Sequence, residues 1–115
     1  MSAAEFAHEW IDAWNARDLE LILSLYSPDI VFTSPFAAQV VPESHGVIRG
    51  IDALRSYWTA GLERNLDLHF DLVQVLETCD GVTILYRNHR DQFVAETLLF
   101  GPDGLVTLGF AAYEP

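Results

Sequence analysis

Apolar residues at the start of the chain recur with helical spacing. Ser2 and Glu5 fit the S-x-x-E capping box, in which the serine accepts from a backbone N–H and the glutamate reaches back. One helical stripe follows: Phe6, Ala7, Trp10, Ile11 and Trp14. Asp18 is placed to cap a second helix over Leu19–Tyr26, which must end before Pro28 because a proline disfavours the α conformation in the residue before it. The pattern predicts a helical hairpin.

The middle of the chain predicts a strand, a long connection and a third helix. Ile30–Ser34 is β-branched and aromatic and is closed by a proline, which is typical of a short strand. Phe36–Arg49 has no clear period, and we expect a connection there with a brief strand near Gln39–Val41. Connections of this length are often lids or binding loops. An apolar stripe then predicts a helix over Ile51–Asn65.

The rest of the chain alternates as strands separated by turns such as Asp80-Gly81. We expect strands over Asp67–Glu77, Val82–Arg90, Phe93–Phe100 and Leu105–Tyr113. Helices followed by an antiparallel meander indicate the α+β class, in a single domain spanning residues 1–115.

The last two expected strands are apolar on both faces, whereas three helices can cover only one face of a sheet. A free apolar face of that size is unusual on a monomer. This pattern predicts a homodimer packed sheet to sheet. The alternative is a highly twisted sheet that wraps on itself.

The composition limits the kinds of partner and cofactor that the chain is expected to bind. The 115 residues include 6 Lys and Arg against 17 Asp and Glu, a formal charge of −11, so nucleic acid and membrane surfaces are poor partners. Half of the residues are apolar, which excludes the disordered classes. The N-terminus lacks a basic and an apolar signal region, and we expect a cytoplasmic protein. Cys79 is the only cysteine and no histidine pair has ligand spacing, so we expect no metal and no cofactor.

Three segments carry a resemblance to a known family: Trp14–Leu19 (WNARDL), Leu25–Phe32 (LYSPDIVF) and Ile48–Leu54 (IRGIDAL). They resemble the nuclear transport factor 2-like superfamily, and within it the SnoaL-like polyketide cyclases and ketosteroid isomerases. The resemblance implies a cone-shaped, cystatin-like α+β barrel, with three N-terminal helices packed in a strongly curved, mostly antiparallel sheet. It also implies a pocket at the open end and usually a dimer. The superfamily includes isomerases, dehydratases, cyclases, epoxide hydrolases and binding modules, so the fold does not determine the chemistry.

The resemblance can be carried to single residues. Ketosteroid isomerases place an aspartate base before a proline, where this chain has Ser34 before Pro35. Their oxyanion tyrosine corresponds to Trp10, whose indole N–H donates a hydrogen bond but has no useful acidity. Their buried, protonated acid corresponds to Glu96. Because one of three roles is retained, steroid isomerisation by the family mechanism is not expected.

The residues themselves also single out Glu96 as a candidate catalytic group. It alternates with apolar residues of its strand, so on a cone-lining face its desolvated carboxyl would have a raised pKa and act as acid or base. The alternatives are an ion pair with Arg87 or Arg90, or exposure to water. Tyr86 and Asn88 share one face of the preceding strand and could polarise a bound carbonyl. Their alternatives are a core tyrosine and a strand-end asparagine.

Aromatic residues at helical spacing are usually core, but in an open cone some become pocket walls for a flat apolar ligand. His45, in the irregular connection, could swing over the pocket as a titrating group or simply be exposed. The predicted ligand pocket consists of Trp10, Trp14, Phe32, Ser34, His45, Tyr57 and Trp58.

These candidates leave two hypotheses for function. The first is a small-molecule pocket protein acting as an enzyme that moves a proton on an apolar carbonyl compound, by isomerisation, dehydration or aldol-type ring closure. The second is a non-catalytic ligand-binding, dimerisation or accessory domain with the same pocket.

Overall fold

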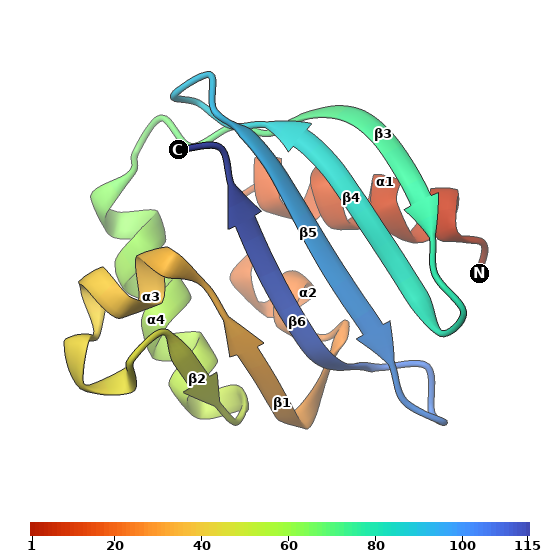
Figure 1. The fold of residues 1–115 in the computed structure, drawn as a ribbon, viewed down its shortest axis with the longest axis horizontal. Coiled ribbons are helices and arrows are strands. Elements are labelled where there is room, and N and C mark those ends of the chain that lie inside the picture. The colour runs from red at the N-terminus through yellow and green to blue at the C-terminus, as the bar shows by residue number, and fades with distance from the viewer.

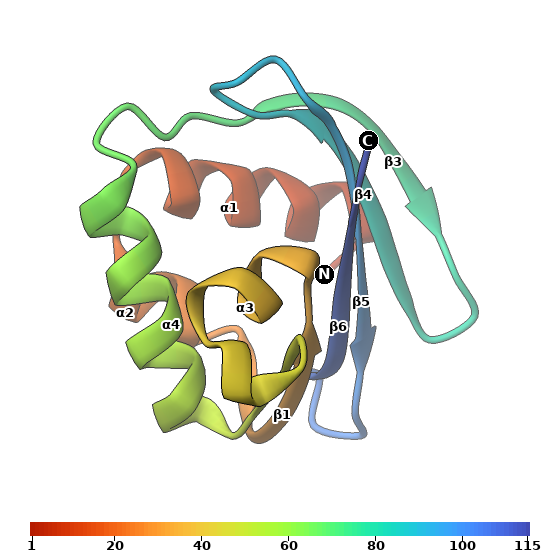
Figure 2. The ribbon, with the colours of Figure 1, turned by 60° about the vertical axis from the view of Figure 1, so that its left-hand side comes forward.

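A computed structural model describes all residues 1–115 and contains one sheet with helices on one side of it (Figures 1 and 2). The helices are α1 (Ala3–Asn15), α2 (Leu19–Leu23), α3 (Pro35–Val40) and α4 (Ile51–Arg64), with a 3-10 turn η1 (Pro42–Ser44). The strands are β1 (Tyr26–Thr33), β2 (Val47–Arg49), β3 (Asp71–Glu77), β4 (Gly81–Arg87), β5 (Phe93–Phe100) and β6 (Val106–Tyr113).

The strand order is β2-β1-β6-β5-β4-β3, and every pair is antiparallel except β1 and β6, which are parallel. The sheet curves around α1 and α4, as Figure 2 shows. The predicted α+β class is confirmed. None of the helices is long and apolar enough to cross a membrane.

The predicted start of the helical hairpin is confirmed. The Ser2 hydroxyl accepts from the backbone N–H of Glu5 at 3.1 Å, and the Ser2 N–H donates to the Glu5 carboxylate at 3.3 Å. Asp18 caps α2 by accepting from Leu21 N. The prediction that this helix reaches Tyr26 is wrong, because Tyr26 pairs with β6 and opens β1. Long-range strand pairing overrides the local helical pattern there.

The expected strand near Gln39–Val41 is also wrong. The chain forms α3 instead, with Pro35 at the first turn and Ser34 as N-cap accepting from Phe36 N at 3.2 Å. The only strand in the connection is the short β2, which pairs with β1. Likewise β3 begins at Asp71 rather than Asp67, because the residues before it are tied to α1: Asn15 bonds both the N–H and the C=O of Phe70.

A β-bulge decides which side chains of β6 face the helices. Val106 pairs with Phe100 and Leu108 pairs with Leu99, so β6 holds one extra residue, Thr107, between these pairs. The alternation therefore shifts within the strand: Val106 is fully buried, whereas Leu108 is 36% exposed on the outer face. The outer face of the sheet remains uncovered within the chain, contrary to the alternative of a sheet that wraps on itself.

Candidate functional site

A cavity of about 310 Å³ lies between α4, α3 and the concave face of the sheet. Its volume is at the lower end of the range for small-molecule sites. Eight of its 18 lining residues are aromatic: Trp14, Phe32, Phe36, Tyr57, Trp58, Phe70, Tyr86 and Tyr113. Trp58 holds the wall together through edge-on contacts with Trp14 (ring centroids 5.0 Å apart) and Phe32 (5.5 Å).

Glu96 is the only acidic residue that lines the cavity. It is 5% exposed, between the fully buried Val94 and Leu98 on the same face of β5. Its Oε1 accepts a hydrogen bond from the Tyr86 hydroxyl at 2.7 Å, and its Oε2 has no partner in the protein. Burial raises the pKa of Glu96 to about 7, against the opposing effect of the Tyr86 hydrogen bond. Both protonation states are therefore accessible near neutrality, as proton transfer requires.

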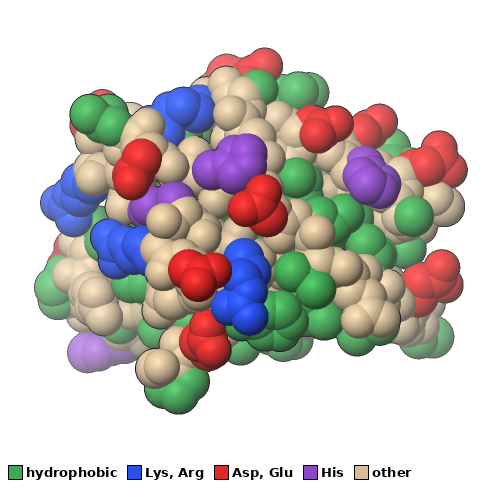
Figure 3. Space-filling model, turned by 90° about the horizontal axis from the view of Figure 1, so that it is seen from above, with side chains coloured by type: hydrophobic (Ala, Val, Ile, Leu, Met, Phe, Trp, Pro, Cys, Tyr) green, Lys and Arg blue, Asp and Glu red, His purple; other side chains and the backbone are tan.

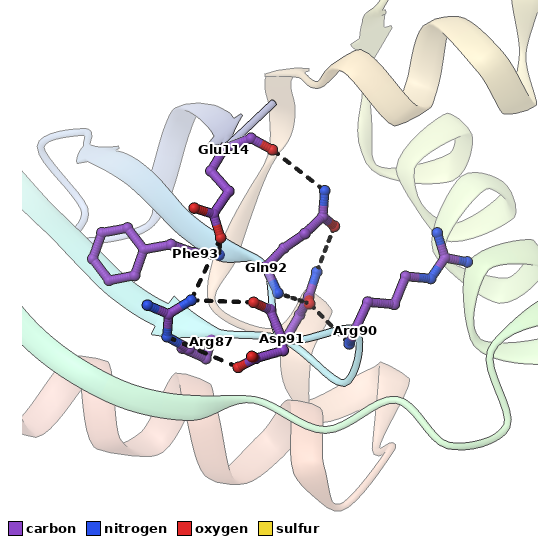
Figure 4. Close-up of polar contacts among 7 residues, drawn as sticks. Arg87, Arg90, Asp91, Gln92, Phe93 and Glu114 are labelled. Atoms are coloured by element: carbon purple, nitrogen blue, oxygen red, sulfur yellow. Dashed lines mark hydrogen bonds and ion pairs between the residues drawn. The ribbon is translucent and has the colours of Figure 1, made fainter.

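The alternative ion pairs of Glu96 are not formed. Figure 4 shows Arg87 in contact with Asp91 and Glu114, at 4.0 and 3.4 Å, and none of these three residues lines the cavity. Arg90 donates instead to Asn65 Oδ1 at 3.2 Å. No cation therefore offsets the burial of the Glu96 carboxyl, which is why burial dominates its pKa.

Phenol groups surround this carboxyl. Tyr57, Tyr86 and Tyr113 all line the cavity, and burial raises the pKa of each, with the charge of Glu96 acting in the same direction. The Ser34 hydroxyl has the opposite effect on the pKa values of Tyr57 and Tyr113. The phenols consequently stay neutral, and those of Tyr57 and Tyr113, unlike the Tyr86 hydroxyl that donates to Glu96, can donate hydrogen bonds toward a ligand.

Three buried side-chain polar atoms lack a hydrogen-bond partner in this structure: Trp14 Nε1, His89 Nδ1 and Glu96 Oε2. All three residues line the same cavity. Buried polar atoms in folded proteins are nearly always paired, so their concentration here distinguishes the cavity from ordinary core. These three atoms can form hydrogen bonds with a ligand that carries polar groups as well as an apolar body.

Six residues of the predicted site line the cavity with Glu96: Trp14, Phe32, Tyr57, Trp58, Tyr86 and Asn88. Asn88, however, is engaged in the β4–β5 turn. Its Oδ1 accepts from the N–H groups of Arg90 and Gln92 at 3.0 Å each, and its Nδ2 donates to Gln92 Oε1 at 3.1 Å. The strand-end alternative therefore describes Asn88, and the amide is not directed at a bound carbonyl.

Three predicted pocket residues lie outside the cavity lining. Trp10 is fully buried, donates from Nε1 to the Tyr26 hydroxyl at 2.9 Å, and stacks on Phe70, which itself forms the cavity wall. Ser34 is buried at the start of α3, where it caps that helix. His45 is exposed in a left-handed conformation after η1. The structure thus places these three residues outside the cavity: Trp10 is covered by Phe70, Ser34 is engaged as a helix cap, and His45 is exposed.

Several lining residues were not predicted from the sequence, chief among them Tyr113, Phe36, Arg64, His89 and Arg90. Tyr113 carried a usable signal, because it alternates with the buried Ala111. Phe36 was not predicted because it lies on helix α3, which the sequence pattern did not indicate. Its ring packs edge-on against that of Tyr113 on β6 (centroids 4.6 Å apart). The remaining three lie in or next to connections whose course depends on tertiary packing.

Comparison with known proteins agrees with this architecture. A family model described as "SnoaL-like domain" matches residues 7–107. The chain belongs to the SnoaL-like family. A SnoaL-like protein of unknown function from Burkholderia thailandensis is 39% identical, with a TM-score of 0.92 over 98% of this chain and 95% of that one. No curated protein matches the sequence.

More distant structures share the fold of this SnoaL-like domain. A protein with cystatin-like fold from Methylobium petroleophilum is 19% identical, with a TM-score of 0.75 over 100% of this chain and 79% of that one. TerC, co-crystallised with polyporic acid, is 16% identical, with a TM-score of 0.78 over 98% and 92%. The cystatin-like description of the fold is thereby confirmed.

Proposed function

We propose that this SnoaL-like domain is an enzyme that binds a small, apolar carbonyl compound in the cavity and moves a proton on it with Glu96. The observation that carries the proposal is the Glu96 carboxyl: buried among aromatic side chains, with a pKa raised to about 7 and with Oε2 unpartnered in the cavity. A group with these properties is matched to acid–base work at neutral pH.

The proposed step is abstraction of a proton from the carbon next to the carbonyl. The C–H electron pair becomes the enolate, and the proton moves to Oε2 of Glu96, from which it returns to carbon or oxygen. The developing oxyanion needs donors, and the Trp14 indole N–H and the neutral phenols of Tyr57 and Tyr113 line the same cavity. Tyr86 orients the carboxyl through Oε1 and leaves Oε2 for the substrate.

A second candidate is a non-catalytic binding domain with the same ligand. It is favoured because this chain lacks the two other groups of the isomerase chemistry. Ser34, at the position of the aspartate base, serves as a helix cap, and Trp10, at the position of the oxyanion tyrosine, donates to Tyr26. TerC, which shares the fold, was co-crystallised with polyporic acid, and this supports the binding of a small organic ligand by a domain of this fold.

The test is a thermal-shift screen of small aromatic, terpenoid and polyketide-like carbonyl compounds on the wild type, E96Q and the control E63Q, whose side chain lies exposed on α4. A ligand at ~100 times its dissociation constant adds about 2.7 kcal/mol of stability. We then expect the hits to exchange their α-protons for solvent deuterium by NMR with the wild type and E63Q but not with E96Q. Binding without exchange supports the binding domain, and a screen without hits overturns both candidates.

We also propose that the domain forms a homodimer through the outer face of its sheet. The outer positions of β5 and β6 carry no charge, although a fifth of the chain is charged. They are Phe93, Ala95, Thr97, Leu99, Leu108, Phe110 and Ala112. Phe110 is 42% exposed on this face. An uncharged and largely apolar strand pair of this kind is typical of an isologous interface.

A further inference from the structure

The rim of the cavity has a charge opposite to that of the chain. Three exposed residues line the cavity: Gln39, Arg64 and Arg90. The chain has only six cationic side chains besides histidine, all of them arginine, against 17 carboxylates. Two of the six therefore stand at the cavity rim, and no carboxylate other than the buried Glu96 lines the cavity with them.

Neither rim arginine is neutralised by a carboxylate. Arg55 is paired with Glu20, and Arg87 with Glu114. Arg90 bonds only the neutral amide of Asn65 through its guanidinium, and Arg64 forms no hydrogen bond or ion pair with another side chain.

The orientation of Arg90 follows from its neighbours. Figure 4 shows its side chain extending away from the Arg87, Asp91 and Glu114 cluster toward α4. Its guanidinium carbon lies 6.0 Å from the centre of the Phe36 ring, which is itself part of the cavity wall. The charge is thus held above the aromatic wall rather than in the acidic cluster nearby.

The charges are unevenly distributed on this end of the molecule. Figure 3 looks onto the end that carries the β4–β5 turn: its right-hand part shows acidic side chains without any arginine, whereas the arginines lie at the left and centre, with acidic side chains among them. At physiological ionic strength the field of distant charges is screened within about 8 Å. The unpaired arginines therefore outweigh the net charge of −11 for a group bound at the rim.

We propose that the ligand of this cavity is an amphipathic organic acid, with an apolar ring against the aromatic wall and a carboxylate held at the rim by Arg64 and Arg90. This inference rests on the proposed function and specifies its substrate class. Guanidinium groups present paired N–H donors that match a carboxylate. The reverse orientation would place the carboxylate against Glu96, where like charges oppose each other and no cation is present.

The test uses 1-tetralone-6-carboxylate and its neutral counterpart 1-tetralone-6-carboxamide, each a flat ring ketone, with affinities measured by calorimetry. For the wild type we expect the acid to bind about tenfold more tightly than the amide, the usual advantage of a hydrogen bond to a charged group. R64Q and R90Q should each weaken the acid by about threefold or more and leave the amide unchanged. R49Q, whose exposed arginine on β2 does not line the cavity, is the control for net charge.

The outcomes separate the two proposals. Equal binding of acid and amide overturns the acid preference and leaves the cavity as a carbonyl-binding site. If R49Q loses as much affinity for the acid as R64Q and R90Q do, the proposed rim contacts are overturned, because the net charge of the protein would then explain the preference. Failure of both compounds to bind overturns this inference as well as the binding that the proposed function requires for such ketones. Melting temperatures of each variant establish that the fold is retained, and R64Q is decisive because Arg64 has no internal partner to lose.

Discussion

The Tyr86 hydroxyl donates to Glu96 Oε1 across two neighbouring strands, at 2.7 Å. The register pairs Ile84 with Glu96 and Tyr86 with Val94, so the two side chains are diagonal neighbours on the inner face of the sheet. The contact holds one carboxylate oxygen and leaves the other toward the cavity. It also opposes the rise in the pKa of Glu96 that burial causes, because a donor to the charged form stabilises that form.

Removing this donor should raise the pKa of Glu96 further. In Y86F burial acts without the opposing hydrogen bond, so we expect the carboxyl to titrate above about 7. The measurement is the ¹³C chemical shift of the Glu96 carboxyl as a function of pH. Y57F is the control, because Tyr57 lines the cavity without a hydrogen bond to Glu96. An unchanged or lowered pKa in Y86F would contradict the assignment.

Glu96 should make the folded state less stable as pH rises. Its pKa is about 7 when folded, against an ordinary 4.5, so the folded state binds the proton more tightly than the unfolded state. The contribution of Glu96 to the free energy of unfolding is therefore fully present below pH 4.5 and is lost as the pH rises to about 7. The total loss is on the order of 3 kcal/mol. In E96Q this loss should disappear from urea-unfolding curves taken across that range. If E96Q and the control E63Q show the same pH profile, the shifted carboxyl is not Glu96.

Substitution of Trp10 should lower the stability of the fold and leave ligand affinity nearly unchanged. W10F removes the donor to Tyr26, leaves that buried hydroxyl unpaired and opens space in the core, so we expect a loss of about 2–4 kcal/mol in the free energy of unfolding. Ligand affinity should change little, because Trp10 does not line the cavity. W58F is the comparison, since Trp58 does line it. A loss of affinity in W10F as large as that in W58F would count against the assignment.

A charge on the outer sheet face should separate the proposed homodimer. F110E places a carboxylate in the middle of that apolar face, and we expect it to sediment as a monomer at micromolar concentration while the wild type sediments as a dimer. L21E is the matched control, because Leu21 is 51% exposed on α2, away from the sheet. A monomeric wild type would remove the proposal altogether.

Two glycine substitutions should have opposite effects. A Cβ at Gly81 would lie 2.1 Å from the carbonyl oxygen of Leu98, so G81A must displace backbone, and we expect it to cost about 3 kcal/mol or more. Gly61 lies within α4 with no atom within 4 Å of its Cβ position, so G61A should stabilise by roughly 1 kcal/mol through helix propensity. Thermal melts of both variants measure the difference, and stabilisation by G81A would contradict the close strand approach.

Local patterns in the sequence were enough to predict much of this protein. The capping box at Ser2 and Glu5 predicted where α1 begins, because its hydrogen bonds join residues three apart. Alternation along β5 placed Glu96 on one face with Val94 and Leu98, since side chains of a strand point to opposite faces in turn, and it predicted a raised pKa if that face lines the cavity, as it does in the structure. Both features depend on near neighbours in the chain.

Tertiary structure decided what distant segments do together. Trp10 and Trp14 share one helical stripe, yet only Trp14 reaches the cavity, because Phe70 from beyond α4 covers Trp10. The rim charge of Arg64 and Arg90 likewise comes from the end of α4 and a turn between strands. A periodic pattern states which face of an element is apolar but not what packs against it, and that choice is made by long-range contacts between segments of very different position in the sequence.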